Sequence, residues 1–373
     1  MVRPLYQPRS GALPKRDERG HAGLWYDKFC DRWSVKTWQL EANDPGGGKL
    51  GWINTLAGQP LGQRQQLQEA CTRLIQLATS RGGKVLVLRS ESRFVTGLGR
   101  SHPIENGFAW HPTLGTPYLP GSSIKGMVRG WAKQEDPQAD SAMLNRVFGA
   151  AGKSGALSFL DAVPIEPVRV EADVMTPHFA GWSPQDPPGD WRSPVPVPFL
   201  ATAAGMPLLF SLIPCGILEP SDLERVMGWL EDALAWAGAG AKTAVGYGRM
   251  VPDQDTTSQR VEEVRKVQAA RQAEIARAER LATLDPLERE LEEIAAAETN
   301  LAPYRTWIKA VQSGRWSAQR ADEKRVLQMI VDAMKGGGIW KEASTKKQPS
   351  KDKEYQLTLQ VKGLLAKNQQ ANA

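Results

Sequence analysis

The sequence predicts an α+β fold, a ferredoxin-like (RRM-like) sandwich with helices on one face of an antiparallel sheet. Two observations predict it. Between residues 84 and 251 the elements follow the order strand, helix, strand, strand, inserted segment, strand, helix, strand, and after Pro252 the composition becomes polar and helical. Two halves of βαβ type in this order are typical of such a sandwich. We therefore expect an N-terminal region at 1–62, the α+β domain at 63–251 and a helical extension at 252–373.

The composition favours a polyanionic partner and a reducing compartment. The 373 residues carry 47 Lys and Arg against 41 Asp and Glu, a net charge of +6, and a positive balance suits polyanions. Cys30, Cys71 and Cys215 lie far apart, which argues against a disulfide framework and against a zinc site. There is no apolar run of membrane-spanning length and no signal-peptide core. We expect a cytoplasmic protein without a membrane partner.

The N-terminal region is predicted to be a basic arm followed by a Trp-rich segment. Lys15 and Arg16 are adjacent, and aromatic residues then follow in quick succession, starting with Trp25 and Phe29. These aromatic side chains are expected either to pack on the core or to stack on bases, as aromatics do in proteins that bind single-stranded nucleic acid.

The first half of the α+β domain reads as a helix, a buried strand, a long loop and a second helix. Apolar residues at helical spacing predict a helix over 63–80, and the run Val85–Leu88 predicts a strand within 84–94. Residues 96–118 form a long irregular loop, which in an ordered domain is usually functional. A helix then starts at Ser122.

The second half contains four predicted strands, one helix and an inserted arm. The strands are predicted at 156–162, 168–174, 206–213 and 244–251. Ser221-Asp-Leu-Glu224 has the pattern of a capping box and predicts a helix that ends at Gly238. Residues 176–205 are rich in proline and contain Trp182 and Trp191, so we expect a projecting Pro-rich arm there.

The extension is predicted to be helical throughout most of its length. Thr256–Ala282 is a polar helix, and the apolar residues of Tyr304–Lys335 suffice for a small bundle. The Lys-rich segment Ser344–Lys353 is expected to be mobile.

A glycine turn and a basic helix predict a phosphate site. Pro120-Gly121 forms a turn, and Ser122 or Ser123 is expected to cap the helix that follows. Lys125 and Arg129 lie one turn apart on that helix. Free backbone N–H groups, the helix dipole and two cations together favour an anion. The alternative is a capped amphipathic helix with a solvated basic edge.

A Gly-rich segment at 238–249 is the second candidate site. Its glycines allow a backbone to approach a ligand closely, its cations add charge, and its tyrosine offers a stacking face. The candidate RNA-binding residues here are Gly238, Gly240, Lys242, Thr243, Tyr247 and Arg249. The alternative is a flexible connection between a helix and a strand.

Histidines and a short glycine motif give weaker catalytic signals. The four histidines have no metal-ligand spacing, although His102 and His111 flank a loop with Glu105, where an acid–base or metal site competes with a structural role. Gly152-Lys-Ser154 resembles the end of a phosphate-binding Walker loop, but Val147 stands where that loop needs glycine. We predict no cofactor.

Two aspartates define an alternative function. Asp161 and Asp173 end predicted strands and are candidates for a metal-dependent nuclease pair, although the sequence identifies no third ligand. Loop capping and turn formation are the simpler roles for both carboxylates. We predict no catalytic residue and no bound metal.

Several separated motifs resemble a known family. They are Thr96-Gly-Leu-Gly99, His102-Pro103, Glu105-Asn-Gly107, His111-Pro-Thr-Leu-Gly115, Pro120-Gly-Ser-Ser-Ile-Lys-Gly126, Asp173-Val-Met-Thr-Pro-His-Phe179, Pro198-Phe-Leu200 and Gly240-Ala-Lys-Thr-Ala-Val-Gly-Tyr-Gly248. On these residues the chain resembles the RAMP family of CRISPR effector subunits, and within it the sixth-subunit family of Cmr, type III-B, complexes. The resemblance covers about 84–251, and the long extension departs from it.

The resemblance implies a RAMP ferredoxin-like fold and a non-catalytic subunit. Such a subunit caps the filament at the 3′ portion of the guide RNA and helps to position target RNA for antiviral interference, while target cleavage belongs to the repeated backbone RAMP. Implied partners are guide RNA, target RNA and the other Cmr subunits, including the backbone RAMP, the small helical subunit and the first subunit. His178, within the sixth-subunit motif, joins the candidate RNA contacts. The alternative is a metal-dependent endoribonuclease acting on guide or target RNA through Asp161, Asp173 or His178.

Overall fold

The computed structural model describes residues 16–32, 37, 40, 48–176, 196–297, 300–316, 320–346 and 348–370. His178, Trp182 and Trp191, and with them most of the predicted Pro-rich arm, lie outside the described residues. The chain divides into two compact units, Met1–Arg265 and Lys266–Ala373. The boundary falls inside the long helix α7 (Gln254–Thr283), rather than at Pro252 where the composition changes.

An antiparallel sheet forms the centre of the first unit. Its strands run in the order β10-β2-β9-β5, and β6 also pairs with β9. Their bounds are β2 Lys84–Ser90, β5 Leu157–Phe159, β6 Val163–Pro164, β9 Pro207–Pro214 and β10 Met250–Pro252. Every pair is antiparallel, with Leu86 opposite Phe210 at the centre. The predicted α+β class with antiparallel sheets is confirmed.

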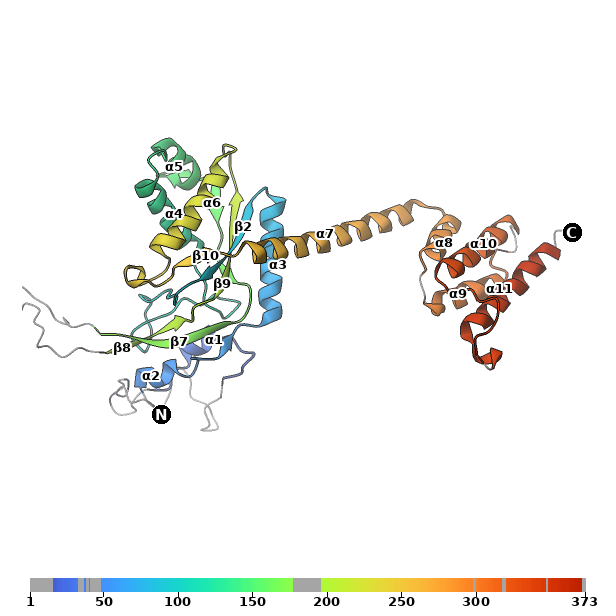
Figure 1. Cartoon of the computed structure of the whole chain (residues 1–373), viewed down its shortest axis with the longest axis horizontal. Coiled ribbons are helices and arrows are strands. Elements are labelled where there is room, and N and C mark those ends of the chain that lie inside the picture. The colour runs from blue at the N-terminus through green and yellow to red at the C-terminus, as the bar shows by residue number, and fades with distance from the viewer. Residues whose placement is uncertain are drawn as a thin grey trace, which may run out of the picture. The chain divides into compact units, whose positions relative to one another are not determined.

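Helices bury both faces of this sheet. Leu86 and Leu88 belong to a core shared with α4 (Gly121–Glu135), α5 (Ser141–Phe148) and α6 (Asp222–Asp232). Val87 points the other way, into a core shared with α3 (Arg64–Ser80) and the start of α7. Figure 1 shows α3 across the sheet from α4 and α6. The predicted sandwich had helices on one face only. The uninterrupted apolar run in β2 needs cover on both sides, and this explains the difference.

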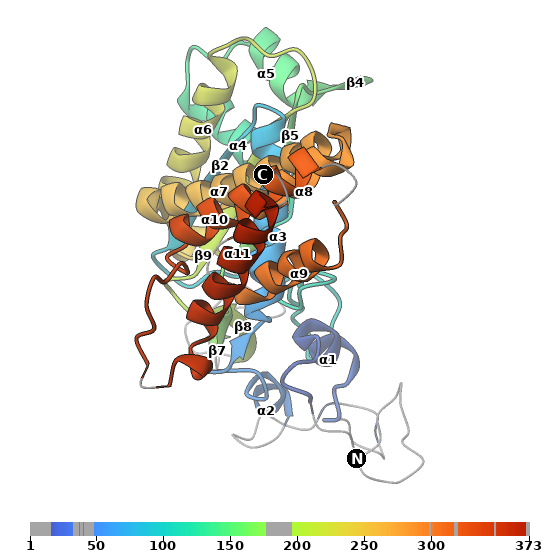
Figure 2. The same cartoon turned by 90° about the vertical axis from the view of Figure 1, so that its right-hand side faces the viewer.

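A second, smaller sheet carries the N-terminal helices. Its order is β1-β7-β8, and the bounds are β1 Pro60–Leu61, β7 Val168–Met175 and β8 Val197–Thr202. Helices α1 (Ala22–Lys28) and α2 (Gly48–Ile53) share a buried cluster with β7 and β8, and Figure 1 shows both helices at this sheet, with α2 below it in Figure 2 as well. The sequence placed 197–202 in the Pro-rich arm. These residues instead form β8, because the apolar strand there pairs with Val170–Met175 of β7.

The aromatic residues near the N-terminus are packed in this region. The rings of Trp25 and Phe29 stack at 5.3 Å, and Tyr26 stacks on Trp52 at 6.1 Å. Tyr26 and Trp52 are buried together with Val170 of β7. Of the two roles that the sequence left open for the Trp-rich segment, its described residues take the packing role.

Two local predictions, for the start of α6 and for the segment that follows it, are wrong. Ser221 makes no side-chain cap to α6. The carboxylate of Asp222 instead accepts the backbone N–H of Glu219 at 2.9 Å and pairs with Arg146. The strand predicted at 244–251 begins only at Met250, because left-handed backbone at Lys242 and at Gly246 brackets a short 3-10 turn. Extended pairing cannot pass through such turns.

The second unit is a helical bundle with its own core. Its helices after α7 are α8 (Pro286–Ala295), α9 (Leu301–Gln312), α10 (Arg320–Gly336) and α11 (Lys353–Gln370). The core includes Leu291, Ile294, Tyr304, Ile308, Val326, Ile330, Met334, Leu357 and Val361. None of the helices within the described ranges combines the length and the apolar character that a membrane span needs.

Candidate nucleic-acid interface

The start of α4 lines an open basic pocket. Ser122, Lys125 and Arg129 form one wall of a pocket of about 780 Å³, while Ser123 does not line it. The lining also includes the hairpin β3–β4 (Gly149–Ala150 and Lys153–Ser154), which contributes the exposed Lys153. The sequence interpretation treated Gly152-Lys-Ser154 only as the possible end of a Walker loop. It therefore did not predict Lys153 as a third cation of the pocket.

Asp161, rather than a serine, caps α4. The helix begins at Gly121, whose N–H donates to Asp161 Oδ1 at 2.7 Å. The predicted caps were therefore wrong, since Pro120 is the N-cap residue and no side-chain cap bond is made from it. A Cβ on Gly121 would lie 2.1 Å from the carbonyl oxygen of Phe159, so the helix starts directly against β5. The Gly121 N–H is already bonded to Asp161, so it is not free to bind an anion in the pocket. Such an anion would be bound mainly by the side-chain cations.

The three cations of the pocket are not neutralised by the part of the chain that the structure describes. Lys125, Arg129 and Lys153 have no ion pair there within 4.0 Å. Elsewhere in the same unit, by contrast, Arg146 pairs with Asp222 at 2.8 Å. Unpaired cations that share a pocket repel one another and favour an anion between them. The pocket therefore has the electrostatic character of a phosphate site.

The glycines of the Gly-rich segment bring protein backbones together. A Cβ on Gly240 would lie 2.1 Å from the carbonyl oxygen of Val95, and one on Gly248 would lie 1.9 Å from that of Ala239. Ala241 N–H donates to the same Val95 oxygen at 2.7 Å. These two glycines are therefore required for close packing inside the chain, a role that the sequence interpretation did not assign to them, and their contact with RNA stays a prediction.

Two other candidates of this segment, Lys242 and Tyr247, lie beside the ring of Phe199 on β8. Lys242 Nζ lies 5.1 Å from the ring centroid, and the Tyr247 ring lies 6.2 Å from it at a tilt. Arg249 is exposed and Thr243 is half-buried. Phe199 is itself fully buried, so Lys242 and Tyr247 cover an apolar side chain and leave their outer sides to solvent. None of the residues 238–249 lines the α4 pocket, so the two candidate sites are separate surfaces.

A polar cluster joins the Gly-rich segment to β7. Tyr247 donates its hydroxyl to Asp173, and Arg93 Nη1 donates to the same carboxylate at 3.0 Å. Arg93 Nε donates to Glu171 at 3.0 Å, and these bonds, Glu171 first, raise the pKa of Arg93. Burial, and then the neighbouring Asp173, raise the pKa of Tyr247. Asp173 is thus engaged by two side-chain donors, and its Oδ1 also accepts the Val174 N–H at 2.8 Å.

The aspartates of the nuclease alternative have separate partners. Asp161 caps α4, whereas Asp173 belongs to the cluster with Arg93 and Tyr247. Within the described ranges, no three His, Cys, Asp or Glu side chains are grouped so that they could hold a metal ion. Since hydrolysis with a metal needs a fixed ligand set, the geometry favours structural roles for these two carboxylates.

The histidine loop is part of the packed interior. His102 Nε2 lies 3.0 Å from the carbonyl oxygen of Tyr26, and its ring stacks on the Tyr26 ring at 4.5 Å. Burial lowers the pKa of His102 to about 4. Glu105 pairs with Lys49, and His111 accepts the Leu114 N–H at 3.3 Å. These contacts support the structural role over the acid–base alternative.

The chain is similar in sequence to proteins of known family. Residues 87–251 match the model of the RAMP superfamily. The chain is 28% identical to Cmr6 of Pyrococcus furiosus over 228 residues, which cover 44% of this chain and 66% of that protein. It is 32% identical to Cmr6 of Saccharolobus solfataricus over 77 residues, 20% of this chain and 26% of the relative. The matches thus span less than two thirds of either relative.

A solved structure is also similar. It is the cryo-electron-microscopy structure of the type III-B Cmr-beta bound to cognate target RNA, matched with a TM-score of 0.46 at 21% identity over 55% of this chain and 71% of that chain. The family model and the two sequence relatives agree on the same assignment. Over residues 87–251 this chain is therefore similar to the RAMP superfamily, and it resembles Cmr6 of the type III-B CRISPR Cmr complex.

Proposed function

We propose that this protein is a non-catalytic, RNA-binding structural subunit of a cytoplasmic type III-B CRISPR ribonucleoprotein. It caps the filament at the 3′ portion of the guide RNA and helps to position target RNA. The observation that carries this proposal is the α4 pocket, where Lys125, Arg129 and Lys153 stand unpaired, among the described residues, inside the region that matches the RAMP superfamily. Guide phosphates occupy the pocket, and Lys242 and Arg249 add a second grip.

The proposal includes a ferredoxin-like topology for the RAMP domain. The order β10-β2-β9-β5 supports it, because the first and third strands of a βαββαβ chain lie at the centre of such a sheet and the fourth and second lie outside them. Helices α4 and α6, the two crossover helices, share one core on the same face of the sheet. This arrangement leaves the start of α4 beside β5, where the pocket forms.

The proposed partners are the other Cmr subunits, including the repeated backbone RAMP, the small helical subunit and the first subunit. The Pro-rich arm is proposed to reach across the guide–target duplex. Relatives named Cmr6 support this assignment at the level of sequence. Mixing the purified protein with the other subunits and guide RNA and then sizing the product tests it. Absence of this chain from the assembled particle would contradict the proposal.

A salt titration tests the phosphate grip. Each lost contact to a phosphate of single-stranded RNA makes the slope of log affinity against log salt shallower by about 0.7. We expect that change for Lys125→Ala, Lys153→Ala and Lys242→Ala, with every guide sequence weakened alike. Lys133→Ala is the matched control, because Lys133 is an exposed cation of the same helix that does not line the pocket. Equal slopes for all four variants and the wild type would refute the pocket as the phosphate site.

The tyrosine provides a test of base stacking. If Tyr247 stacks on a base, Tyr247→Ala costs about 1–3 kcal/mol of binding and leaves the salt slope unchanged. Tyr247→Phe keeps the ring and removes only the hydroxyl that bonds Asp173, so it is the control. An equal loss for both variants would assign the effect to the polar cluster instead of stacking.

A nuclease assay addresses the alternative function. The pure protein is incubated with guide or target RNA and a divalent metal, and we expect no cleavage, because Asp161 and Asp173 have separate structural partners. Cleavage that Asp161→Ala or Asp173→Ala abolishes would establish the endoribonuclease alternative.

A further inference from the structure

The positive charge of the chain is concentrated in the last part of the second unit. Residues 301–373 contain 14 Lys and Arg against 6 Asp and Glu, whereas residues 1–265 contain 28 against 27. Residues 266–300, which include α8, are acidic, with 5 against 8. The net charge of +6 therefore arises from α9, α10, α11 and the segment between the last two helices. A field of this kind attracts polyanions.

Three of the four glutamates of α8 are paired with arginines of the same unit. Glu288 pairs with Arg325 at 2.6 Å, Glu290 pairs with Arg315, and Glu292 pairs with Arg280. These pairs account for acidic and basic charges in equal number. The lysines that follow Trp340 have fewer acidic neighbours, so their charge is not cancelled in the same way.

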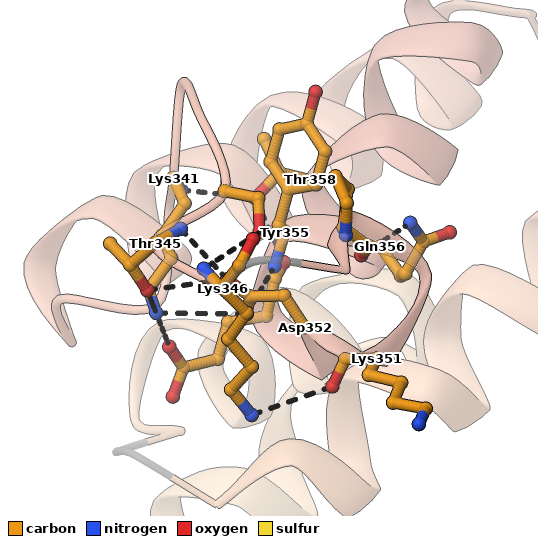
Figure 3. A network of polar contacts seen from close by, with 11 residues as sticks. Lys341, Thr345, Lys346, Lys351, Asp352, Tyr355, Gln356 and Thr358 are labelled. Carbon is orange, nitrogen blue, oxygen red and sulfur yellow. Dashed lines mark hydrogen bonds and ion pairs between the residues drawn. The ribbon is translucent and has the colours of Figure 1, made fainter.

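The segment between α10 and α11 is built around a buried carboxylate. Asp352 is 1% exposed, and its Oδ2 accepts the Ser344 hydroxyl at 3.1 Å and the Thr345 N–H at 3.2 Å. Lys341 Nζ lies 3.7 Å from its other oxygen. Figure 3 shows Asp352 at the centre of these contacts. The sequence predicted a mobile segment here, and the structure gives its described residues a defined set of bonds.

Asp352 is charged but directed inward. Burial acts to raise the pKa of Asp352, but the Tyr355 N–H, the Ser344 hydroxyl and the Thr345 N–H together lower it below its usual value. A carboxylate satisfied in this way shapes the segment without reaching the surface. It therefore leaves the outward lysines of the same segment unneutralised.

Two lysines of this segment and the first residue of α11 are exposed, and together we call them the lysine face. Lys346, Lys351 and Lys353 are all exposed, and no carboxylate of the described residues lies within 4.0 Å of them. Lys346 Nζ donates to the carbonyl oxygen of Lys351 at 3.4 Å, which places the Lys346 ammonium beside the backbone of Lys351 (Figure 3). The lysine face thus carries three exposed positive charges within eight residues of a folded unit.

We propose that the lysine face binds the phosphate backbone of single-stranded RNA, so that the second unit is an RNA-binding module in addition to the RAMP domain. Flexible lysines neutralise phosphates without reading bases, so binding here is indifferent to sequence. An acidic protein partner fits less well, because the cores of protein interfaces are depleted of lysine and are apolar. The described part of 301–373 exposes a single large apolar side chain, Leu359.

The test uses the full chain and a labelled polyuridine RNA. The triple variant Lys346→Gln, Lys351→Gln, Lys353→Gln should make the salt slope shallower by about 2, three times the single-contact value of about 0.7. At 0.1 M salt the same relation predicts a loss of about a hundredfold in affinity. The melting temperature should stay that of the wild type, since all three side chains are exposed.

A matched control separates this face from net charge alone. The variant Arg280→Gln, Arg315→Gln, Arg325→Gln removes the same three charges from the same unit, but at positions already paired with α8. We expect its slope to stay near the wild-type value. Equal effects of both triple variants, or no effect of the lysine variant, would overturn the proposal. So would a lysine variant that loses binding to polyglutamate, an acidic-protein probe, while its affinity for RNA is unchanged.

Failure here is distinguishable from failure of the proposed function. Lys125→Ala and Lys153→Ala report on the α4 pocket, and the lysine-face variant reports on the second unit. Combining them should give additive changes of slope, because the sets lie in different compact units. A change with the pocket variants alone would leave the RAMP proposal intact and remove this one.

Discussion

Single residues in this protein hold positions that local patterns do not reveal. Asp161 closes the start of α4 from another part of the chain, with its Oδ1 2.7 Å from Gly121 N. It thereby fixes the helix that carries Lys125 and Arg129. A side-chain cap is typically worth about 1 kcal/mol to a helix. A carboxylate weighed as a nuclease ligand thus acts as the orienting element of the basic pocket.

His102 should make the stability of the first unit depend on pH. Its folded pKa is about 4, against an ordinary value of 6.5, because the ring is buried. Between these two values the unfolded chain binds more protons than the folded one, so stability falls as the pH is lowered from about 6.5 towards 4. The loss should reach about 3 kcal/mol at the lower end.

The measurement is urea unfolding at several pH values for the wild type and for His102→Gln. The variant is expected to be less stable at pH 7 because it loses the stacking with Tyr26, but its stability should vary less across this range. A variant with the full wild-type pH dependence would show that another group is responsible.

At the scale of elements, the Gly-rich segment is a packed connection with a charged outer side. Gly238, Gly240 and Gly248 all adopt left-handed φ, and Ala239 N–H donates to the carbonyl oxygen of Gly248 at 2.9 Å. The segment closes on itself between α6 and β10. This closure presents Lys242 and Arg249 in fixed positions, which is what a phosphate grip requires.

Gly240→Ala should cost more stability than Gly246→Ala. Both positions have left-handed φ, so both substitutions introduce a backbone cost of about 1–2 kcal/mol. Only at Gly240 would the new Cβ also meet the Val95 carbonyl, at 2.1 Å, whereas Gly246 faces open space. Chemical denaturation should show at least about 1 kcal/mol between the two variants. If they lose the same stability, the contact with Val95 is not a constraint.

At the scale of the whole molecule, two compact units share the helix α7. Its first turns belong to the first unit, because Thr257 Oγ1 accepts the Val87 N–H at 2.9 Å and Val264 packs with Val87. Its remainder belongs to the second unit. The change of composition at Pro252 marks the start of this helix rather than the end of the first core.

Two truncations test this division. A chain ending at Arg265 should fold with the stability of the first unit and still bind guide RNA. A chain ending at Pro252 should be less stable by about 3 kcal/mol, since it loses the burial of Val264 and the bond from Thr257. Thermal melting of both chains measures the difference. Equal melting temperatures would show that the first turns of α7 contribute nothing to the core.

The sequence by itself determined the α+β class, the antiparallel strands at the centre of the first unit, the helical second unit and the cations on α4. Each of these follows from local periodicity, since alternation, helical spacing and turn residues are set by neighbours in the chain. The strand predicted within 84–94 is confirmed as β2. Its short apolar run is buried on both faces of the sheet, as the local pattern predicts.

Only the tertiary structure decided how distant segments meet. Lys153 and Lys125 line the same pocket although they lie on different elements, and Asp161 takes the place of the serines as the cap of α4. Gly240 packs closely against the Val95 carbonyl. These contacts depend on which faces the sheet brings together, and no spacing within a local stretch encodes them. The separation of Asp161 from Asp173 into different polar contacts was decided in the same way.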